Sequence, residues 1–161
     1  MLGVTKQSIT AAISGKTWSH LEINRDIMKS IPKLIQEAQV VFNEFIRLRD
    51  ASGSHFKCIS CDEIKPTEYM EAGHFYSTKL APGLRYNEDN CHGQCHHCNC
   101  FLYGNLDKYA VNLVKKIGPQ KFSELVQQKA EYTRTGHKWS RTELIEIIEY
   151  YKQQVHNLKA A

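Results

Sequence analysis

Four cysteines in this sequence have the spacing with which thiolates bind a single metal ion. They form two Cys-x-x-Cys pairs: Cys58, Cys61, Cys95 and Cys98. Two such pairs supply all four ligands of a tetrahedral zinc site, which is structural because it leaves no coordination position open. A ligand set that recruits Cys91, Cys100 or a histidine is the alternative.

Metal binding explains these cysteines better than disulfide or redox chemistry does. All six cysteines lie between positions 58 and 100, and Cys-x-x-Cys pairs in a reducing compartment are typical of zinc ligands. Two pairs without a surrounding βαβ pattern argue against a thioredoxin-like function. We therefore expect a structural Zn²⁺.

Length and composition limit the number of domains, the location of the protein and the kinds of partner it can have. A chain of 161 residues suits one domain with a small appendage. No apolar run is long enough to cross a bilayer, and the N-terminus lacks a signal-peptide pattern, so we expect a cytoplasmic protein without a membrane partner. The net charge of +4 is compatible with a nucleic-acid partner but does not demonstrate one.

Residues 1–29 are expected to form an N-terminal arm. A short helix is predicted over residues 5–18, with Thr5 as its N-cap and Gly15 as its stop. A single helix has no core of its own. The arm is therefore interpreted either as the remnant of a helix-turn-helix module or as a segment that docks on the rest of the chain.

Helical periodicity dominates both sides of the cysteine-bearing region. Apolar residues recur at three- and four-residue steps over 32–50 and again over 106–156. The second stretch is divided into three helices at 118–119 and at 135–137. Ser140 and Glu143 form a capping box at the start of the last helix.

Residues 55–105 lack this period and are rich in Gly, Asn, Asp and Cys. Such a segment cannot build a large apolar core, so a bound metal would have to supply stabilisation. The candidates for a small core around a β-hairpin are Phe56, Ile59, Tyr69, Phe75, Tyr76, Leu84 and Tyr86. The predicted fold class is α+β, mainly helical, with a small metal-stapled insert.

The polar residues between the cysteine pairs resemble the HNH nuclease family, and the whole pattern is more closely similar to the NinG (Rap) recombination proteins of lambdoid phages. In chain order, the matching segments are Cys58–Cys61, Ala72–Phe75, Arg85–Asn90, Gln94–Asn99, Gly104–Asn105 and Tyr109. The resemblance begins at the helix over 32–50, which leaves residues 1–29 outside it. It implies a nuclease domain over 30–161 with a ββα-metal, HNH-like (treble-clef-like) zinc core over 55–105.

The resemblance implies a DNA endonuclease that cleaves branched recombination intermediates such as Holliday junctions and D-loops, using Mg²⁺ or Mn²⁺. His74 corresponds to the general base, Asn90 to the residue that orients it, and Asn99 to the last motif position, often a metal ligand. A neutral imidazole is suited to removing a proton from water. Arg85 and Lys79 are the expected phosphate contacts.

Gly73 departs from the HNH pattern, in which an Asp or His that binds the metal often precedes the base histidine. Three explanations remain open: another group completes the metal site, His74 itself binds the metal, or catalysis has been lost. The groups available for the first explanation are Glu71, Asp89, His92, His96 and His97.

Each of these residues also has a structural explanation. His74 could be a hydrogen-bonded structural histidine, Asn90 and Asn99 could cap helices, and His96 and His97 could be exposed spacers. A non-catalytic module that binds DNA junctions is therefore the second hypothesis, and a protein–protein adaptor is the third. Because resolving a four-way junction needs two symmetric cuts, a homodimer is expected.

Overall fold

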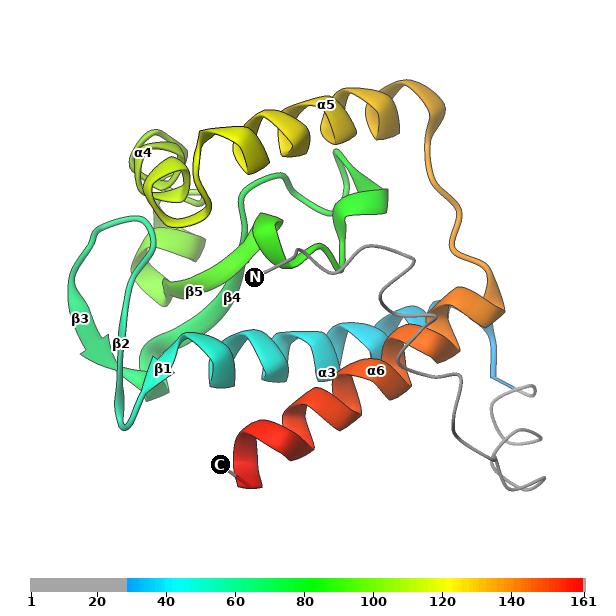
Figure 1. Cartoon of the computed structure of the whole chain (residues 1–161), viewed down its shortest axis with the longest axis horizontal. Coiled ribbons are helices and arrows are strands. Elements are labelled where there is room, and N and C mark those ends of the chain that lie inside the picture. The colour runs from blue at the N-terminus through cyan, green and yellow to red at the C-terminus, as the bar shows by residue number, and fades with distance from the viewer. Residues whose placement is uncertain (1–28, 161) are drawn as a thin grey trace. The chain divides into compact units, whose positions relative to one another are not determined.

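The computed structural model describes residues 29–160, in which helices predominate and strands are short (Figure 1). The described residues form two compact units, one from 29–45 with 138–160 and the other from Ile46–His137. We call the first the helical unit and the second the cysteine-bearing unit. The mixed α+β, mainly helical class is confirmed. The short helix predicted over residues 5–18 lies outside the described residues.

The helical unit is formed by the start of α3 (Ile31–Asp50) and by α6 (Arg141–Ala160), which lie side by side in Figure 1. The apolar stripe of α3 is buried here, and the ring of Phe42 meets that of Tyr151 edge to face at 5.0 Å. The helix predicted over 32–50 is confirmed.

The capping box predicted at the start of α6 is also confirmed. The Ser140 N–H donates to Glu143 Oε2 at 3.0 Å, and the Glu143 N–H donates to Ser140 Oγ at 3.2 Å. Both bonds satisfy amide groups that a helix N-terminus leaves without intrahelical partners.

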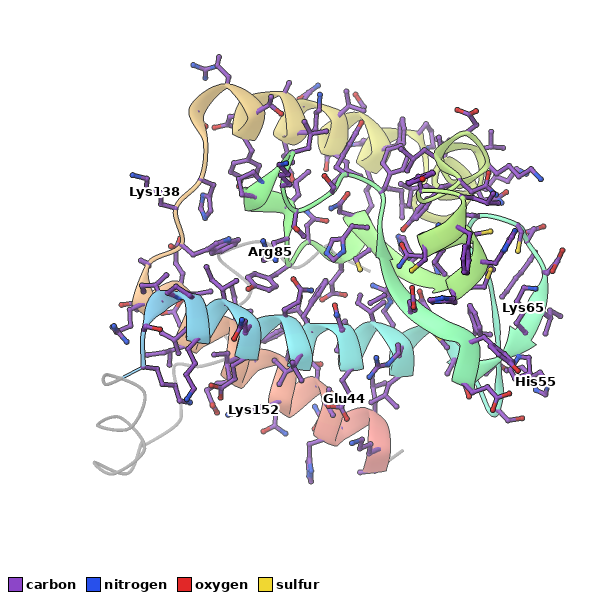
Figure 2. The ribbon with its side chains drawn as sticks, turned by 180° about the vertical axis from the view of Figure 1, so that it is seen from behind. Glu44, His55, Lys65, Arg85, Lys138 and Lys152 are labelled. Carbon is purple, nitrogen blue, oxygen red and sulfur yellow. The ribbon has the colours of Figure 1, made fainter. Side chains whose placement is uncertain are left out.

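Short antiparallel strands shape the cysteine-bearing unit. They are β1 (Ala51–Ser52), β2 (His55–Lys57), β3 (Ile64–Pro66), β4 (Met70–His74) and β5 (Cys91–Cys95). The first three pair in the order β1-β2-β3, and the side chains of His55 and Lys65 project from this sheet (Figure 2). β4 and β5 form a separate hairpin in which Met70 pairs with Cys95 and His74 with Cys91. The predicted β-hairpin is thus confirmed.

Helical turns and two helices complete this unit. The turns are η1 (Thr67–Tyr69), η2 (Pro82–Leu84), η3 (Glu88–Asn90) and the π-helical η4 (His97–Phe101). The helices are α4 (Leu106–Ile117) and α5 (Pro119–Thr135). They are separated at Gly118, whose φ of +85° is a conformation that favours glycine. The helix break predicted at 118–119 is confirmed.

The core of the cysteine-bearing unit is small and divided. One buried cluster consists of Ile59, Ala81, Leu84, Tyr109, Leu113 and Leu125. A second consists of Phe56, Met70 and three cysteines, Cys58, Cys95 and Cys98. Most of the predicted core residues are buried or packed against these clusters, but the prediction for Tyr69 is wrong. Its side chain is 54% exposed, because it closes η1, a surface turn without buried residues.

The end of α3 is joined to the hairpin by an ion pair between neighbouring residues. Asp50 accepts hydrogen bonds from Arg49 Nε at 3.0 Å and from the Gly93 N–H of β5 at 2.7 Å. Arg49 Nη2 in turn donates to the Cys91 carbonyl at 2.9 Å and lies 2.9 Å from His92 Nδ1. This network fixes where β5 begins relative to the helix.

Charge keeps Asp50 ionised although it is buried. Burial raises the pKa of its carboxyl, but contacts with His92 and Arg49 and the nearby Lys116 outweigh this and hold the pKa well below its usual range. Burial also lowers the pKa of His92, which leaves a neutral ring beside Arg49. The network is therefore a buried, hydrogen-bonded ion pair whose members depend on one another.

We predict that Asp50→Asn destabilises the hairpin by about 3 kcal/mol, because it removes the carboxylate charge that pairs with the partly buried Arg49 at 3.0 Å. Hydrogen exchange of the β4 and β5 amides measures the effect. Glu124→Gln on α5 is the matched control, since Glu124 is exposed and its loss of charge should change protection little. Equal protection in the two variants would contradict the prediction.

Candidate metal centre and catalytic site

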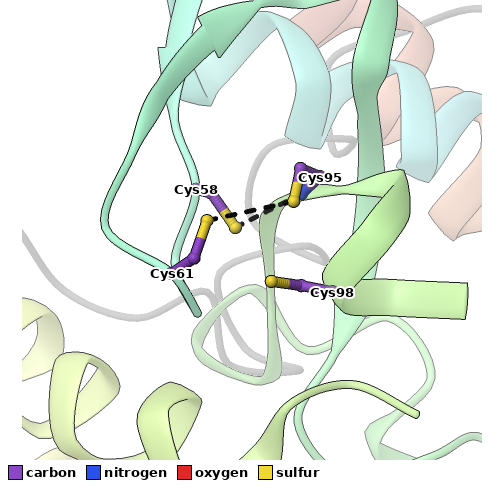
Figure 3. A group of neighbouring side chains, drawn as sticks. All are labelled: Cys58, Cys61, Cys95 and Cys98. Atoms are coloured by element: carbon purple, nitrogen blue, oxygen red, sulfur yellow. Dashed lines mark hydrogen bonds between the residues drawn. The ribbon is translucent and has the colours of Figure 1, made fainter. Parts of the chain in front are cut away.

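The four predicted zinc ligands converge in the cysteine-bearing unit (Figure 3). Cys58 and Cys61 lie in the turn between β2 and β3, whereas Cys95 ends β5 and Cys98 lies in η4. Their sulfur atoms all lie within 4.8 Å of one another, and Cys61 Sγ is 4.0 Å from Cys95 Sγ. Tetrahedral zinc with Zn–S bonds of about 2.3 Å places sulfurs roughly 3.8 Å apart. The cluster could therefore hold a metal such as Zn²⁺.

The surroundings of the sulfurs suit a bound cation. Burial raises the pKa of the thiols, and the pKa of Cys61, Cys95 and Cys98 is raised overall. The pKa of Cys58 is lowered instead, because backbone N–H groups point at its sulfur and outweigh burial; the Cys95 N–H lies 3.3 Å away. Four adjacent thiolates repel one another, so a divalent cation would remove the main cost of ionising them.

His74 is held at the end of β4. Its Nε2 lies 2.8 Å from the Arg85 carbonyl oxygen, and its Nδ1 lies 3.7 Å from Cys91 Sγ. Burial lowers the pKa of His74, and the Arg85 charge adds to this, although the hydrogen bond to the carbonyl opposes it. His74 is therefore neutral at neutral pH, with the Nε2 proton on the carbonyl side and the lone pair on Nδ1.

Asn90 braces the loop between the two hairpin strands. Its Oδ1 accepts the Tyr76 N–H at 2.8 Å, and its Nδ2 donates to the carbonyls of Tyr76 and Leu84 at 3.0 and 3.2 Å. The Asn90 carbonyl also accepts the Phe75 N–H at 2.8 Å. The side chain is fully buried. Asn90 thus holds the backbone that leads up to Arg85, whose carbonyl contacts His74.

Gly73 is required by the packing of a residue that sequence reasoning overlooked. A Cβ at position 73 would lie 2.1 Å from Gln94 Oε1 and 2.8 Å from Gln94 Cβ. Gln94 cannot move away easily, since it is fully buried and its Nε2 donates to Ser60 Oγ and to the Gly104 carbonyl, both at 2.6 Å. The space that an Asp or His would need is therefore filled by Gln94.

A second group of potential ligands lies where β4 meets η4. Glu71 Oε1 is 2.6 Å from His96 Nδ1, and Glu71 Oε2 accepts from Asn99 Nδ2 at 2.6 Å and from Cys100 Sγ at 3.5 Å. Burial raises the pKa of Glu71, but these contacts outweigh it and lower the pKa overall. Glu71, His96 and Cys100 could together hold a metal ion. His96 is thus exposed, as expected of a spacer, yet has a specific partner.

The described contacts join the site residues into two groups. Glu71 and Asn99 belong to one, whereas His74 and Asn90 belong to the other. Side chains alternate along a strand, so Glu71 and His74 project from opposite faces of β4. His74 also lines a cavity of about 440 Å³ together with Tyr103, Asp107 and Lys129.

The other residues suggested to complete the metal site, Asp89, His92 and His97, do not belong to the second ligand group. Asp89 is paired with Lys121 at 3.3 Å, and His92 is buried beside Arg49 and Asp50. His97 is exposed, with its ring 5.9 Å from that of Phe101.

The two predicted phosphate contacts differ in their surroundings. Lys79 is exposed in the loop after β4. Arg85, which Figure 2 labels, is only partly exposed and follows η2. Among the described residues, no helix is both long and apolar enough to span a membrane.

Fold and site together define a small mixed α+β protein with a cysteine cluster suited to a structural metal. The family model described as "Bacteriophage Lambda NinG protein" matches residues 7–160. The chain therefore belongs to the NinG family of phage proteins. The match begins well before residue 30, so the expectation that residues 1–29 lie outside the resemblance was wrong.

Curated relatives agree with this assignment. The chain is 35% identical to protein ninG of Escherichia phage lambda over 139 residues, which cover 86% of this chain and 64% of the relative. It is 34% identical to protein ninG of Salmonella phage P22, with 86% and 64% covered. The matched part of this chain thus spans about 64% of the length of these relatives. No solved structure matches the chain significantly.

We predict that the purified chain carries one tightly bound zinc ion and that Cys95→Ser loses it, because three thiolates no longer complete the tetrahedral site. Metal analysis after dialysis measures the stoichiometry. Cys100→Ser is the matched control, because Cys100 is exposed and outside the four-cysteine cluster. Zinc retained by Cys95→Ser, or lost equally from both variants, would contradict the assignment.

Proposed function

We propose that this protein is an HNH-type endonuclease that cleaves phosphodiester bonds in branched DNA, such as Holliday junctions and D-loops, with a divalent metal ion. The observation that carries the proposal is the state of His74. A neutral histidine ends one strand of a hairpin, its Nε2 is engaged by a backbone carbonyl, and it lines a cavity. This is the arrangement that a general base needs.

The order of elements supports the same proposal. His74 ends β4, Asn90 immediately precedes β5, and Asn99 lies in the helical turn that follows β5. A strand–strand–helix unit braced by two cysteine pairs is the pattern expected of a ββα-metal nuclease. The NinG family model matches residues 7–160, which is why we apply the proposal to the matched chain and not to this unit alone.

The side chains divide the chemistry between them. His74 Nδ1, which lies 3.7 Å from the Cys91 thiol, would take a proton from a water molecule that replaces this contact, and the water oxygen would attack phosphorus while the P–O3′ bond breaks. Asn90 would keep His74 oriented by holding the loop that carries the Arg85 carbonyl. Lys129, which lines the same cavity, would contact a phosphate.

Glu71, His96 and Asn99 are the residues that would hold the catalytic ion. A carboxylate, an imidazole and an amide oxygen are all ligands that Mn²⁺ accepts, and the amide of Asn99 would have to turn so that its oxygen faces the ion. A bound Mg²⁺ or Mn²⁺ would stabilise charge on the leaving 3′ oxygen. Cys100 would favour a transition metal over Mg²⁺.

A non-catalytic protein that binds DNA junctions is the second candidate. Gln94 fills the space beside Gly73, and Glu71 and His74 project from opposite faces of β4. Both observations favour a scaffold that positions its helices on DNA without cutting it. Cleavage assays distinguish the two candidates. For either one, the expected partner is branched DNA, bound by a homodimer.

We predict that His74→Ala abolishes cleavage of a labelled four-way junction in Mg²⁺ or Mn²⁺, while zinc content and junction affinity persist. His55→Ala on β2 is the matched control, since His55 is an exposed histidine outside the cavity. Because burial lowers the pKa of His74 below its ordinary value of 6.5, cleavage should weaken only as pH falls below ~6.5. Unchanged cleavage by His74→Ala would refute its role as the base.

We predict that Glu71→Gln raises the Mn²⁺ concentration needed for half-maximal cleavage by about 10–100-fold, because the amide no longer supplies an anionic oxygen. Titration calorimetry with Mn²⁺ in the absence of DNA gives the affinity directly. His97→Ala serves as the control, because His97 is an exposed neighbour of His96 outside the ligand group. Equal Mn²⁺ affinity in the wild type and Glu71→Gln would contradict this ligand set.

A further inference from the structure

Three consecutive apolar residues are exposed directly after the second cysteine pair. Phe101 is 66% exposed, Leu102 44% and Tyr103 89%. Large apolar side chains gathered in this way on a surface mark a binding site more often than chance exposure does. We call these three residues the apolar tip.

The backbone that presents the apolar tip is strained. Tyr103, Gly104 and Asn105 have φ angles of +50°, +91° and +46°. Residues other than glycine rarely adopt such angles, and they persist only where the surroundings impose them. Strain of this kind clusters at functional sites.

The residues that follow the tip are hydrogen-bonded to the cysteine cluster. The Gly104 N–H donates to the Cys98 carbonyl at 2.9 Å, and Asn105 Nδ2 donates to Cys98 Sγ at 3.6 Å. The Gly104 carbonyl accepts from Gln94 Nε2 at 2.6 Å and from Ser60 Oγ at 3.0 Å. These bonds hold the backbone that directly follows the tip, which reduces the conformational freedom that its backbone loses when the tip binds.

The tip adjoins the cavity that contains His74. Tyr103 and Leu106 line this cavity together with His74 and Lys129. The ring of Phe101 lies 5.4 Å from that of His96. The two exposed aromatic rings thus lie beside different groups of the proposed site, Tyr103 beside His74 and Phe101 beside His96, and Lys129 in the cavity supplies a cation that suits a phosphate.

We propose that the apolar tip is a stacking platform for an unpaired nucleobase at the branch point of a DNA substrate. In continuous duplex both faces of every base are covered by neighbours, so a rigid aromatic ring gains contact only where a base is unstacked. Leu102 between the two rings would act as a wedge that keeps the strands apart. This inference rests on the proposed function, because it assigns the residues with which that same site would recognise the branch point.

The test compares forked DNA with a blunt duplex of matched length, without added Mg²⁺ or Mn²⁺ and with the full zinc-loaded chain. Tyr103→Ala is expected to weaken binding to the fork about tenfold and to leave duplex binding unchanged. Tyr103→Phe should retain fork affinity. Tyr69→Ala is the control, since Tyr69 is also an exposed tyrosine at 54%. Zinc content verifies that each variant is folded.

A fluorescent adenine analogue at the branch reports stacking directly. Wild-type protein should quench its emission, and Tyr103→Ala should not. Fork affinity and quenching that survive in Tyr103→Ala, or equal losses on fork and duplex, would overturn the inference. Loss of self-association instead of fork binding would assign the tip to contacts between copies and would also overturn it. Because no cleavage is measured, failure of the nuclease proposal remains distinguishable from failure of this one.

Discussion

The cysteine cluster is the contact on which the cysteine-bearing unit depends. It connects the turn between β2 and β3 to the end of the β4–β5 hairpin, across residues 62–94. The apolar clusters nearby are too small and divided to hold these segments together unaided. A metal bound by all four thiolates would therefore contribute folding energy directly. This centre and the Arg49–Asp50 network together hold the hairpin, and the centre also contacts η4 and the residues after it.

Buried polar side chains also hold together segments of the cysteine-bearing unit that are distant in the sequence. Ser60, Asn90, His92 and Gln94 are buried, and each of the four has hydrogen-bonding contacts with segments distant in the sequence. In a low-dielectric interior such contacts are strong when satisfied and costly when broken. Gln94 has two roles: its amide nitrogen links Ser60, which lies between Cys58 and Cys61, to Gly104, and its bulk excludes any side chain at position 73. The arrangement of strands and turns in this unit is therefore specified by hydrogen bonding as much as by apolar packing.

This architecture separates the two halves of the proposed chemistry. The histidine that would act as base is held through the loop braced by Asn90, whereas the carboxylate that would bind metal is held by η4. The π-helical geometry of η4 brings Asn99 and Cys100 to the same carboxylate, and such irregular helical turns are frequent at functional sites. Because these groups project from opposite faces of β4, they would contact different parts of an extended substrate in the arrangement described.

The sequence alone determined the local features of this protein. Cysteine spacing, helical periodicity and the capping box depend on residues close together in the chain, so they predict the cysteine cluster, the helices and the start of α6 correctly. The tertiary structure decided what depends on strand register. It placed Gln94 opposite Gly73, aligned Glu71 with His96 and Asn99, buried Cys91 beside His74, and exposed Tyr69. The physical reason is that a shift of one residue in the pairing of β4 with β5 would reverse which side chains meet on each face, and no local pattern specifies that pairing.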